Sequence, residues 1–376
     1  MITKDYTVAR MPGDGIGPEV IREASKVVEA AAAKYGFSVT WADYPFGAEH
    51  WLRTGETLPD STLDEIGEMD ALLLGAVGDP RVKPGVLERG ILLKIRFHYD
   101  QYANLRPARS YPNVPTPVRL STGGRLDTLV VRENTEDFYI GIGGRTQGSS
   151  LSMDLTTQRG LYSVTGGLEG GFTNGVEGVI QLGVATEPGI RRVTALAARA
   201  AKERGESGIA LATKSNVMPQ IYGFWEEVAK DEAARHGVGL TPVNADAMCY
   251  HLARTPELYG VILAPNMFGD IVSDLLAGLA GGLGTAAGAD IGDGLSMFEP
   301  VHGSAPDIAG TGRANPIAAI LTAAMMLDHL GEREAARRVD EALTTYLSQS
   351  VPKELPFEFG GEASTATVGD RIAEGV

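Results

Sequence analysis

The N-terminal part of the chain alternates between two spacings of apolar side chains, and these spacings predict alternating strands and helices. Residues 6–11 form a short strand-like run, and residues 18–36 carry apolar side chains on one face at helical spacing. Pro18 and Glu19 suit the first turn of this helix, and Gly36 suits its end.

The alternation continues with a strand at residues 37–44, a helix at 61–68 and a buried strand at 71–74. Further along, residues 188–203 predict a helix and residues 208–213 a strand. Strands that alternate with helices are typical of an α/β domain with a largely parallel sheet.

Two later segments have other patterns. Residues 141–175 are rich in Gly, Ser and Thr and lack a helical stripe, which indicates β-structure or a protruding arm. Asn315 and Pro316 are expected to cap a helix that runs towards Gly331. No internal repeat or low-complexity linker marks a domain boundary.

The composition excludes several classes of function. The formal net charge of −15 would repel a nucleic-acid backbone, and no run of Lys and Arg offsets it. No apolar segment reaches the roughly 20 residues that span a bilayer, and the N-terminus lacks a signal-peptide pattern. The single cysteine, Cys249, excludes an internal disulfide, and its neighbours favour a buried packing role. We therefore expect a cytoplasmic protein that binds neither nucleic acid nor membrane.

The loop between the first strand and the first helix has the sequence GDGIG, at residues 13–17. A dinucleotide-binding fingerprint requires G-x-G-x-x-G, and here the third glycine comes one residue early. Taken alone, the loop indicates a tight strand-to-helix turn.

Two aspartates, Asp270 and Asp274, lie four residues apart in a stretch with helical spacing, so that both carboxylates point the same way. An acidic pair of this kind is usually a solvated face. This helix is otherwise almost wholly apolar, however, and a bound cation would explain the pairing. Ligands that are all oxygen favour Mg²⁺ or Mn²⁺ over zinc.

Arg96 and Arg106 stand among apolar neighbours, and Arg132 follows further along. A guanidinium in such surroundings needs an anionic partner, and its fork suits a carboxylate. Substrate binding and ion pairing to the chain's many acids explain this pattern equally well.

Four segments together resemble the β-decarboxylating dehydrogenases, the family of isopropylmalate, isocitrate, homoisocitrate and tartrate/D-malate dehydrogenases. In the family's order along the chain, they are residues 12–20 (PGDGIGPEV), 102–107 (YANLRP), 266–274 (NMFGDIVSD) and 299–310 (EPVHGSAPDIAG). The resemblance implies an α/β fold of two domains around a cleft, and not a Rossmann fold. It implies a cofactor-binding domain of residues 1–101 plus 281–376, and a substrate, metal and dimerisation domain of residues 102–280.

The resemblance also implies the catalytic and metal-binding residues. Lys214 would take the proton of the substrate's C2 hydroxyl, and Tyr139 would protonate the enolate carbon after CO₂ leaves. Mg²⁺ or Mn²⁺ would be bound by Asp246, Asp270 and Asp274. In the family, the lysine and the first of these aspartates reach in from the partner subunit, which implies a homodimer with shared sites.

Substrate contacts follow from the same resemblance. Arg96, Arg106 and Arg132 would bind the carboxylates of a small 2-hydroxy acid. Leu92 and Leu93 would offer an apolar wall to a substituent on C3.

The implied cofactor is NAD. The residues implied to contact it are Ala76, Val77 and Gly78 near the nicotinamide, and His302, Gly303, Ser304, Ala305, Asp307 and Asn315 near the adenosine. Asp307 can accept hydrogen bonds from both ribose hydroxyls and would repel a 2′-phosphate. Three of these residues have structural alternatives: a packed histidine at His302, a helix cap at Asn315 and a turn at Asp307.

Two stretches, residues 51–59 and 85–94, resemble actinobacterial isopropylmalate dehydrogenases of leucine biosynthesis. They favour the conversion of 3-isopropylmalate to 2-oxoisocaproate and CO₂. Residues 100–102 and 213–216 resemble the tartrate/D-malate branch, so that activity, or a specialised paralogue acting on another 3-substituted malate, is the alternative.

An alternative of another class is a catalytically silent regulatory subunit. Such a chain is expected to lose the lysine, the tyrosine or a metal aspartate, and all of these are present. Two positions depart from the family: Asp137 stands where many relatives have glycine, and Arg89 where isopropylmalate dehydrogenases often have glutamate.

Overall fold

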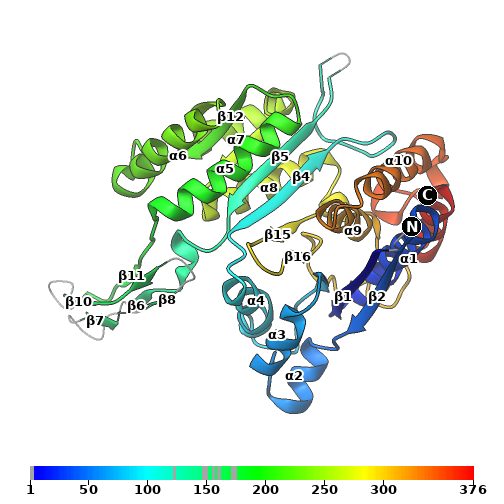
Figure 1. Cartoon of the computed structure of the whole chain (residues 1–376), viewed down its shortest axis with the longest axis horizontal. Helices are drawn as coiled ribbons and strands as arrows, with labels where there is room; N and C mark the ends of the chain where they lie inside the picture. Colours follow the sequence, from blue (N-terminus) through cyan, green and yellow to red (C-terminus); the bar gives the residue numbers. More distant parts are fainter. Residues whose placement is uncertain (1–3, 122–123, 146–150, 155–156, 159–161, 171–175) are drawn as a thin grey trace. The chain divides into compact units, whose positions relative to one another are not determined.

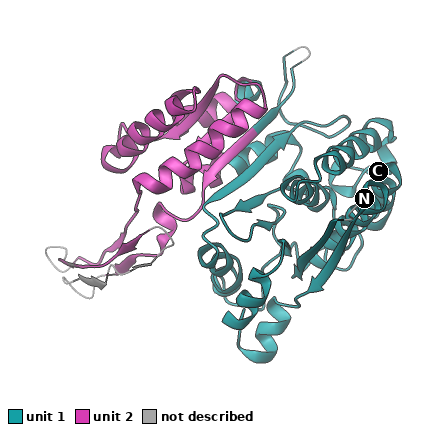
Figure 2. Ribbon diagram, in the orientation of Figure 1, with its two compact units in different colours: residues 1–128, 253–257, 273–376 teal, residues 129–252, 258–272 magenta. Residues whose placement is uncertain are grey.

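The computed structural model describes residues 4–121, 124–145, 151–154, 157–158, 162–170 and 176–376 of the chain. The chain divides into two compact units (Figure 2). Unit 1 contains residues 1–128, 253–257 and 273–376, and unit 2 contains residues 129–252 and 258–272.

The sheet of unit 1 has the strand order β4-β15-β16-β3-β1-β2 (Figure 1). The strands are β1 (Lys4–Gly13), β2 (Phe37–Asp43), β3 (Ala71–Ala76), β4 (Ala103–Arg109), β15 (Ala289–Ile291) and β16 (Met297–Phe298). β1 is parallel to β2 and β3, and β16 is parallel to β3, whereas β15 is antiparallel to β4 and β16. The predicted parallel arrangement of the N-terminal strands is therefore confirmed.

The helices of unit 1 are α1 (Gly17–Tyr35), α2 (Ala48–Thr54), α3 (Asp60–Gly67), α4 (Leu93–His98), α9 (Ile317–His329), α10 (Arg333–Gln349) and α11 (Thr365–Gly375). Shorter turns are η1 (Glu88–Leu92), η6 (Leu283–Thr285), η7 (Pro352–Glu354) and η8 (Phe357–Phe359), and η5 (Pro256–Leu258) lies at the unit boundary. α1 ends as predicted, because Gly36 takes the left-handed conformation (φ +77°) and its N–H donates to the Ala32 carbonyl. The predicted apolar face of α1 is buried against α9 and α11.

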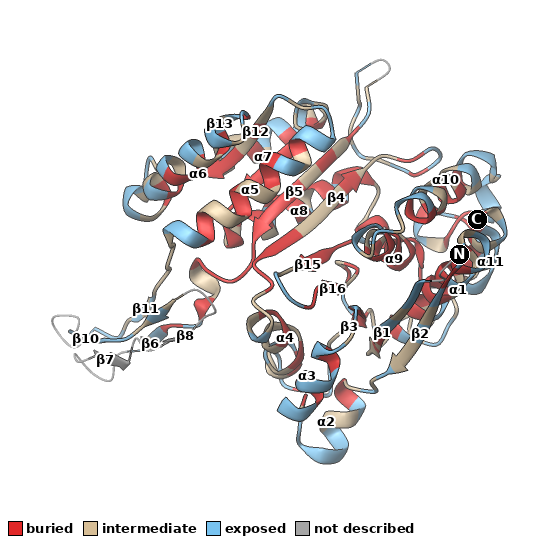
Figure 3. Cartoon of the chain, in the orientation of Figure 1, coloured by how far each residue is buried: buried red, intermediate tan, exposed pale blue. Residues whose placement is uncertain are grey.

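Unit 2 is built on parallel strands in the order β13-β12-β14-β5. The strands are β5 (Asp127–Glu133), β12 (Gly208–Thr213), β13 (Gly239–Asn244) and β14 (Val261–Ala264). The helices and turns are α5 (Glu187–Glu203), α6 (Phe224–Arg235), α7 (Ala245–Arg254), α8 (Asn266–Ala280), η2 (Phe138–Ile140) and η4 (Pro219–Gly223). β5 is buried from Val130 to Glu133 (Figure 3), so the loop that follows it starts inside unit 2.

The segment predicted as β-structure or an arm contains short antiparallel pairs where it is described. β6 (Gly143–Arg145) pairs with β11 (Val179–Gln181), β7 (Leu151–Asp154) with β10 (Gly167–Gly170), and β8 (Thr157–Gln158) with β9 (Ser163–Val164). Figure 1 shows these strands extending away from α5 and α6 of the same unit. Residues 146–150, 155–156, 159–161 and 171–175 of the predicted segment lie outside the described part of the chain.

Candidate functional site

Three of the predicted site residues meet in unit 2. The Arg132 guanidinium donates to Asp270 (Nη1 to Oδ1, 2.7 Å), and the Tyr139 hydroxyl donates to the other oxygen of the same carboxylate (2.9 Å). The guanidinium also lies 5.3 Å from the centre of the Tyr139 ring. The Tyr139 phenol, the Asp270 carboxylate and the Arg132 guanidinium therefore form one cluster.

Helix α8 holds Arg132 in place in two ways. Its first residue, Asn266, accepts hydrogen bonds from Arg132 through both its backbone and side-chain oxygens (2.8–3.1 Å). A side chain at Gly269 would place its Cβ 2.5 Å from the Cγ of Arg132. Glycine at this position therefore allows the arginine stem to lie against the helix.

The loop between β5 and Tyr139 contains two buried glutamates. The Glu133 carboxylate accepts from the backbone N–H groups of Thr135 (2.7 Å) and Glu136 (2.9 Å). Burial raises the pKa of Glu133 to about 8, and the nearby Glu136 adds to the rise. Glu136 in turn accepts from the backbone N–H of Thr186 (2.9 Å), the residue that caps α5. These bonds connect the loop to β5 and α5.

Asp137, noted above as a departure from the family, has an unusual backbone. Its dihedral angles are φ +61° and ψ −144°, a region that is essentially reserved for glycine and costs other residues about 1–3 kcal/mol. Burial raises the pKa of its carboxyl group, while a hydrogen bond from the Met267 N–H opposes the rise.

The second predicted metal ligand lies on the same helix but has a different partner. α8 continues into unit 1 at Ser273, so that Asp274 follows Asp270 by one turn. Arg106 Nη1 donates to Asp274 Oδ1 (3.0 Å) and to the Ser273 hydroxyl (2.9 Å). Asp270 and Asp274, two of the three predicted metal carboxylates, are thus each in contact with one predicted substrate arginine.

Arg96 is bound to acids of unit 1. Its guanidinium lies 2.6 Å from Glu299 and 3.3 Å from Asp290, and its side chain is almost fully buried. Burial and the nearby Asp290 raise the pKa of Glu299 to about 7, whereas Arg96 opposes the rise. These contacts give Arg96 the structural ion pairs that the sequence left open, and its role towards a substrate stays a prediction.

Lys214 and Asp246 lie together elsewhere in unit 2. Lys214 Nζ is 2.7 Å from Asp246 Oδ1, and this contact lowers the pKa of the carboxyl group. Among the described residues of this single chain, no three His, Cys, Asp or Glu side chains are grouped so that they could hold a metal ion. Asp270 and Asp274 offer the oxygen ligands that Mg²⁺ or Mn²⁺ prefers.

Unit 1 contains a pocket of about 570 Å³ where the adenosine was expected. Its lining includes four of the predicted cofactor residues, namely His302, Gly303, Ala305 and Asn315. The sequence did not reveal the remaining lining residues, which are Ile16, Leu283, Gly284, Ile308, Arg313, Phe357 and Glu358. They come from separate parts of the chain, with Ile16 near its start and Phe357 near its end, so only the folded chain brings them to one place.

His302 is suited to bind the edge of a nucleobase. The imidazole is buried, and its Nδ1 donates to the Gly303 carbonyl (3.0 Å), which leaves Nε2 as an acceptor. Nε2 has no hydrogen-bond partner within the described part of the chain. Burial lowers the pKa of this histidine, so the neutral form is favoured. A buried acceptor beside an apolar pocket fits the amino group of an adenine.

Asn315 caps the start of α9 and also lines the pocket, and its contact with a cofactor stays a prediction. Its Oδ1 accepts from the backbone N–H of Ile317 (3.2 Å) at the start of α9, and its amide donates to Glu358 (2.8 Å). Ala305 has φ +38°, a strained backbone for a residue with a side chain. Asp307, two residues after Ala305, is exposed.

The GDGIG loop contacts both of the segments that are predicted to bind the cofactor, residues 76–78 and 302–307. A side chain at Gly13 would collide with the Ala76 carbonyl, and one at Gly15 with the Ser304 carbonyl. The Asp14 carboxylate accepts from the N–H groups of Gly78 (2.9 Å) and Ala48 (2.7 Å). The tight turn that the sequence indicated is confirmed, and Asp14 is a supporting residue that the sequence did not reveal.

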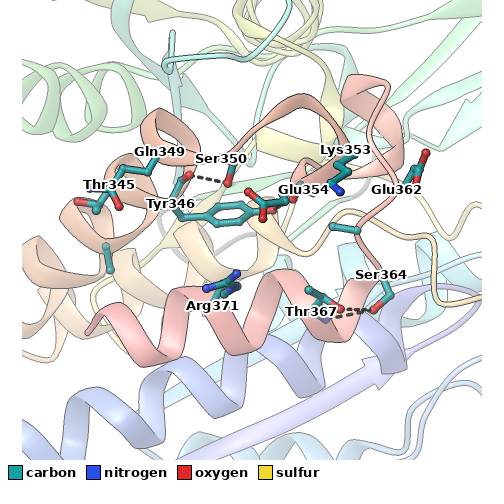
Figure 4. Close-up of a pocket in the computed structure, with 12 residues that line it drawn as sticks. Thr345, Tyr346, Gln349, Ser350, Lys353, Glu354, Glu362, Ser364, Thr367 and Arg371 are labelled. Atoms are coloured by element: carbon teal, nitrogen blue, oxygen red, sulfur yellow. Dashed lines mark hydrogen bonds between the residues drawn. The ribbon is translucent and has the colours of Figure 1, made fainter.

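A separate hollow of about 700 Å³ lies between α10 and α11 (Figure 4). Lys353 and Arg371 line it together with Glu354 and Glu362, so its charges balance. None of the predicted site residues lines this hollow, and nothing in the structure indicates a ligand for it.

Cys249 is half-buried and not buried, and desolvation raises the pKa of its thiol. Within the described residues, no helix is long and apolar enough to cross a membrane.

Comparison with known proteins gives matches over the whole chain. A sequence model of the isocitrate/isopropylmalate dehydrogenase family matches residues 7–372. The 3-isopropylmalate dehydrogenase of Thermobifida fusca (strain YX) is 40% identical over 380 residues, covering 100% of this chain and 99% of that protein. The 3-isopropylmalate dehydrogenase of Mycolicibacterium gilvum (strain PYR-GCK) is 40% identical over 369 residues, covering 97% and 98%.

Solved structures agree with these sequence matches. The isocitrate dehydrogenase from Methylococcus capsulatus has a TM-score of 0.81 at 31% identity, covering 98% of this chain and 99% of that one. A β-decarboxylating dehydrogenase from Thermococcus kodakarensis has a TM-score of 0.75 at 34% identity, covering 98% and 96%. The resemblance inferred from the four sequence segments, and the predicted fold class, are confirmed.

Proposed function

Since this chain belongs to the isocitrate/isopropylmalate dehydrogenase family, and is therefore an oxidoreductase, we propose that it oxidises and decarboxylates a 3-substituted malate with NAD and a divalent metal. The preferred substrate is 3-isopropylmalate, and the products are 2-oxoisocaproate, CO₂ and NADH.

The observation that carries this proposal is the contact of the Tyr139 hydroxyl with Asp270 beside Arg132. A decarboxylating dehydrogenase needs a proton donor at the carbon that loses CO₂, and that donor must lie close to the groups that hold the substrate. Tyr139 supplies the proton, and Arg132 and Arg106 bind the substrate carboxylates. Arg96 is assigned to bind the substrate carboxylates as well. To do so, it would exchange its ion pairs with Glu299 and Asp290 for a substrate carboxylate.

Asp270, Asp274 and Asp246 of a second subunit would hold Mg²⁺ or Mn²⁺, because all three offer oxygen ligands. A divalent ion bound there would withdraw electrons from the C2 oxygen while the carboxylate on C3 leaves as CO₂. Lys214 accepts the proton of the C2 hydroxyl as hydride leaves that carbon.

NAD would place its adenosine in the pocket lined by His302. The His302 acceptor, the apolar walls and the Asn315 amide suit an adenine and its ribose. Bound NAD would accept the hydride from C2 of the substrate through its nicotinamide. Ala76, Val77 and Gly78 are assigned to the nicotinamide, and Asp307 to the ribose hydroxyls.

We propose a homodimer, in which Lys214 and Asp246 act in the site of the partner. Exposed large apolar side chains are concentrated in unit 2, and such surfaces commonly mark interfaces. They are Val176, Val179, Val217, Phe224, Tyr250, Leu258 and Ile271.

The substituent on C3 is assigned from Leu92 and Leu93, which are half-buried and precede Arg96 by about one helical turn. An apolar wall beside a carboxylate clamp suits an isopropyl group. The relatives named above as 3-isopropylmalate dehydrogenases support this assignment. Tartrate or (R)-malate oxidation is the second candidate, because residues 213–216 resemble that branch.

Steady-state kinetics with 3-isopropylmalate, (R)-malate, tartrate, isocitrate and homoisocitrate would test the substrate. We expect the highest kcat/KM with 3-isopropylmalate. Because one methylene in an apolar pocket changes binding by only about 1–3 kcal/mol, close alkylmalates should also react. A kcat/KM for tartrate or (R)-malate that is orders of magnitude higher would overturn the assignment in favour of the second candidate.

A further inference from the structure

The backbone of Asp137 is held in a glycine-like conformation by contacts on several sides. Its N–H donates to the Val184 carbonyl (2.7 Å), and its own carbonyl accepts from the Val184 N–H (3.2 Å). A residue with a side chain remains in this conformation only where its surroundings hold it there.

The side chain of Asp137 makes two further bonds inside unit 2. Its Oδ2 accepts from the backbone N–H of Met267 (2.9 Å), and its Oδ1 accepts from the Tyr222 hydroxyl (3.2 Å). Met267 lies in the first turn of α8, where backbone N–H groups lack partners within the helix. The Tyr222 ring packs on Phe268, with ring centres 4.8 Å apart. The buried carboxylate therefore connects the loop, the start of α8 and the turn η4.

These contacts form two parallel connections between the loop and α8. The first joins Asp137 to Met267, and the second joins Tyr139 to Asp270. Along the loop the two connections are two residues apart, and along the helix they are three residues apart. The connection from Asp137 to Met267 sets how far the loop lies from α8, and so sets the distance that the Tyr139 side chain spans to reach Asp270.

We propose that Asp137 is a positioning residue that holds the Tyr139 hydroxyl against Asp270. This inference rests on the proposed function, in which Tyr139 donates a proton to the substrate. Glycine would adopt the backbone conformation without strain, but it would leave the Met267 N–H and the Tyr222 hydroxyl without this acceptor.

The test is a double-mutant cycle of Asp137→Gly and Tyr139→Phe, with Asp137→Asn as the matched control. Asparagine retains an oxygen for the Met267 N–H and the shape of the side chain, so most of kcat should remain. Asp137→Gly should lower kcat by about 10–100-fold with little change in the KM of the acid, because small displacements of a reacting group have effects of this size. Activity is measured with NAD, Mg²⁺ and whichever of the five acids above gives the highest kcat/KM.

The double-mutant cycle tests the proton-donor role of Tyr139 separately from the positioning role of Asp137. If Asp137 acts through Tyr139, adding Asp137→Gly to Tyr139→Phe should cause no further loss of kcat. A normal kcat in Tyr139→Phe would overturn the proposed function of the tyrosine, and this inference with it. A low kcat in Tyr139→Phe with independent, multiplicative effects would overturn the role of Asp137 alone.

A crystal structure of Asp137→Gly gives a readout that needs no turnover. We expect the distance from the Tyr139 hydroxyl to Asp270, 2.9 Å in the unaltered chain, to lengthen, or the tyrosine to occupy more than one conformation. An unchanged contact in the glycine variant would refute the positioning role.

Discussion

Replacement of Asp270 by asparagine should weaken both metal binding and the fold, whereas replacement of Asp274 should weaken mainly metal binding. The two carboxylates are one turn apart on α8, and each contacts an arginine. Their burial differs. In the Arg132–Asp270 pair the side chains are 2% and 35% exposed, and in the Arg106–Asp274 pair they are 10% and 57% exposed.

The difference in burial sets the expected magnitudes. A hydrogen bond to a charged group contributes about 1.5–3 kcal/mol, and removal of the carboxylate would leave the deeply buried Arg132 without this counter-charge. Because Asp270 is itself partly exposed, we expect Asp270→Asn to lower the free energy of unfolding by about 2 kcal/mol. The Asp274 pair is closer to a surface ion pair, so Asp274→Asn should lower it by about 0–1 kcal/mol.

Urea unfolding in EDTA measures the free energy of unfolding of each variant without metal. Calorimetric titration with Mn²⁺ measures the affinity of each variant for the metal. Both variants should bind Mn²⁺ much more weakly than the unaltered protein. Equal stability losses, or a larger loss in Asp274→Asn, would show that the burial argument fails. Unchanged Mn²⁺ affinity in both variants would show that these carboxylates are not the metal ligands.

The remaining predictions concern the cofactor, pH and subunit sharing. His302→Ala should raise the Kd of NAD about 10-fold through the loss of one hydrogen bond, and an unchanged Kd in a fluorescence titration would contradict this. NAD should exceed NADP in kcat/KM by about 10-fold or more because Asp307 repels a 2′-phosphate, and equal efficiencies would indicate that it only stabilises a turn. The folded protein binds the proton of Glu133 up to a pKa of about 8, well above the ordinary glutamate value, so the free energy of unfolding should fall as pH rises from about 5 to 8. Glu133→Gln should flatten this dependence in urea unfolding at several pH values, and an equally steep profile would contradict the assignment. Mixed Tyr139→Phe and Lys214→Ala chains, each with a low kcat alone, should regain activity as heterodimers, and no recovery after mixing and refolding would argue against shared sites.

The elements that could be predicted from the sequence are those in which local pattern and burial agree. α1 has an apolar face at helical spacing and a terminal glycine, so its span followed from the chain alone. The antiparallel strand β15 could not be predicted in this way. It is very short, and its direction depends on neighbours from other parts of the chain.

The candidate site shows the same limit. The i,i+4 spacing was enough to predict that Asp270 and Asp274 share one helix. Spacing could not indicate that Arg132 contacts the first and Arg106 the second, because these contacts join residues more than 100 positions apart. Glu358, which binds Asn315 beside the pocket, has no local signal at all. The residue type of Asp137 does not indicate its positive φ, and the one signal for it is that many relatives have glycine at this position.

The coupling of oxidation to loss of CO₂ is tested most directly by measuring both products in one reaction. The protein would be supplied with NAD, Mg²⁺ and 3-isopropylmalate labelled in the carboxylate on C3. Absorbance would report NADH, and trapped label would report CO₂. We predict equal amounts of NADH and labelled CO₂ throughout the reaction, with 2-oxoisocaproate as the organic product. Formation of NADH without labelled CO₂ would contradict the proposed oxidative decarboxylation.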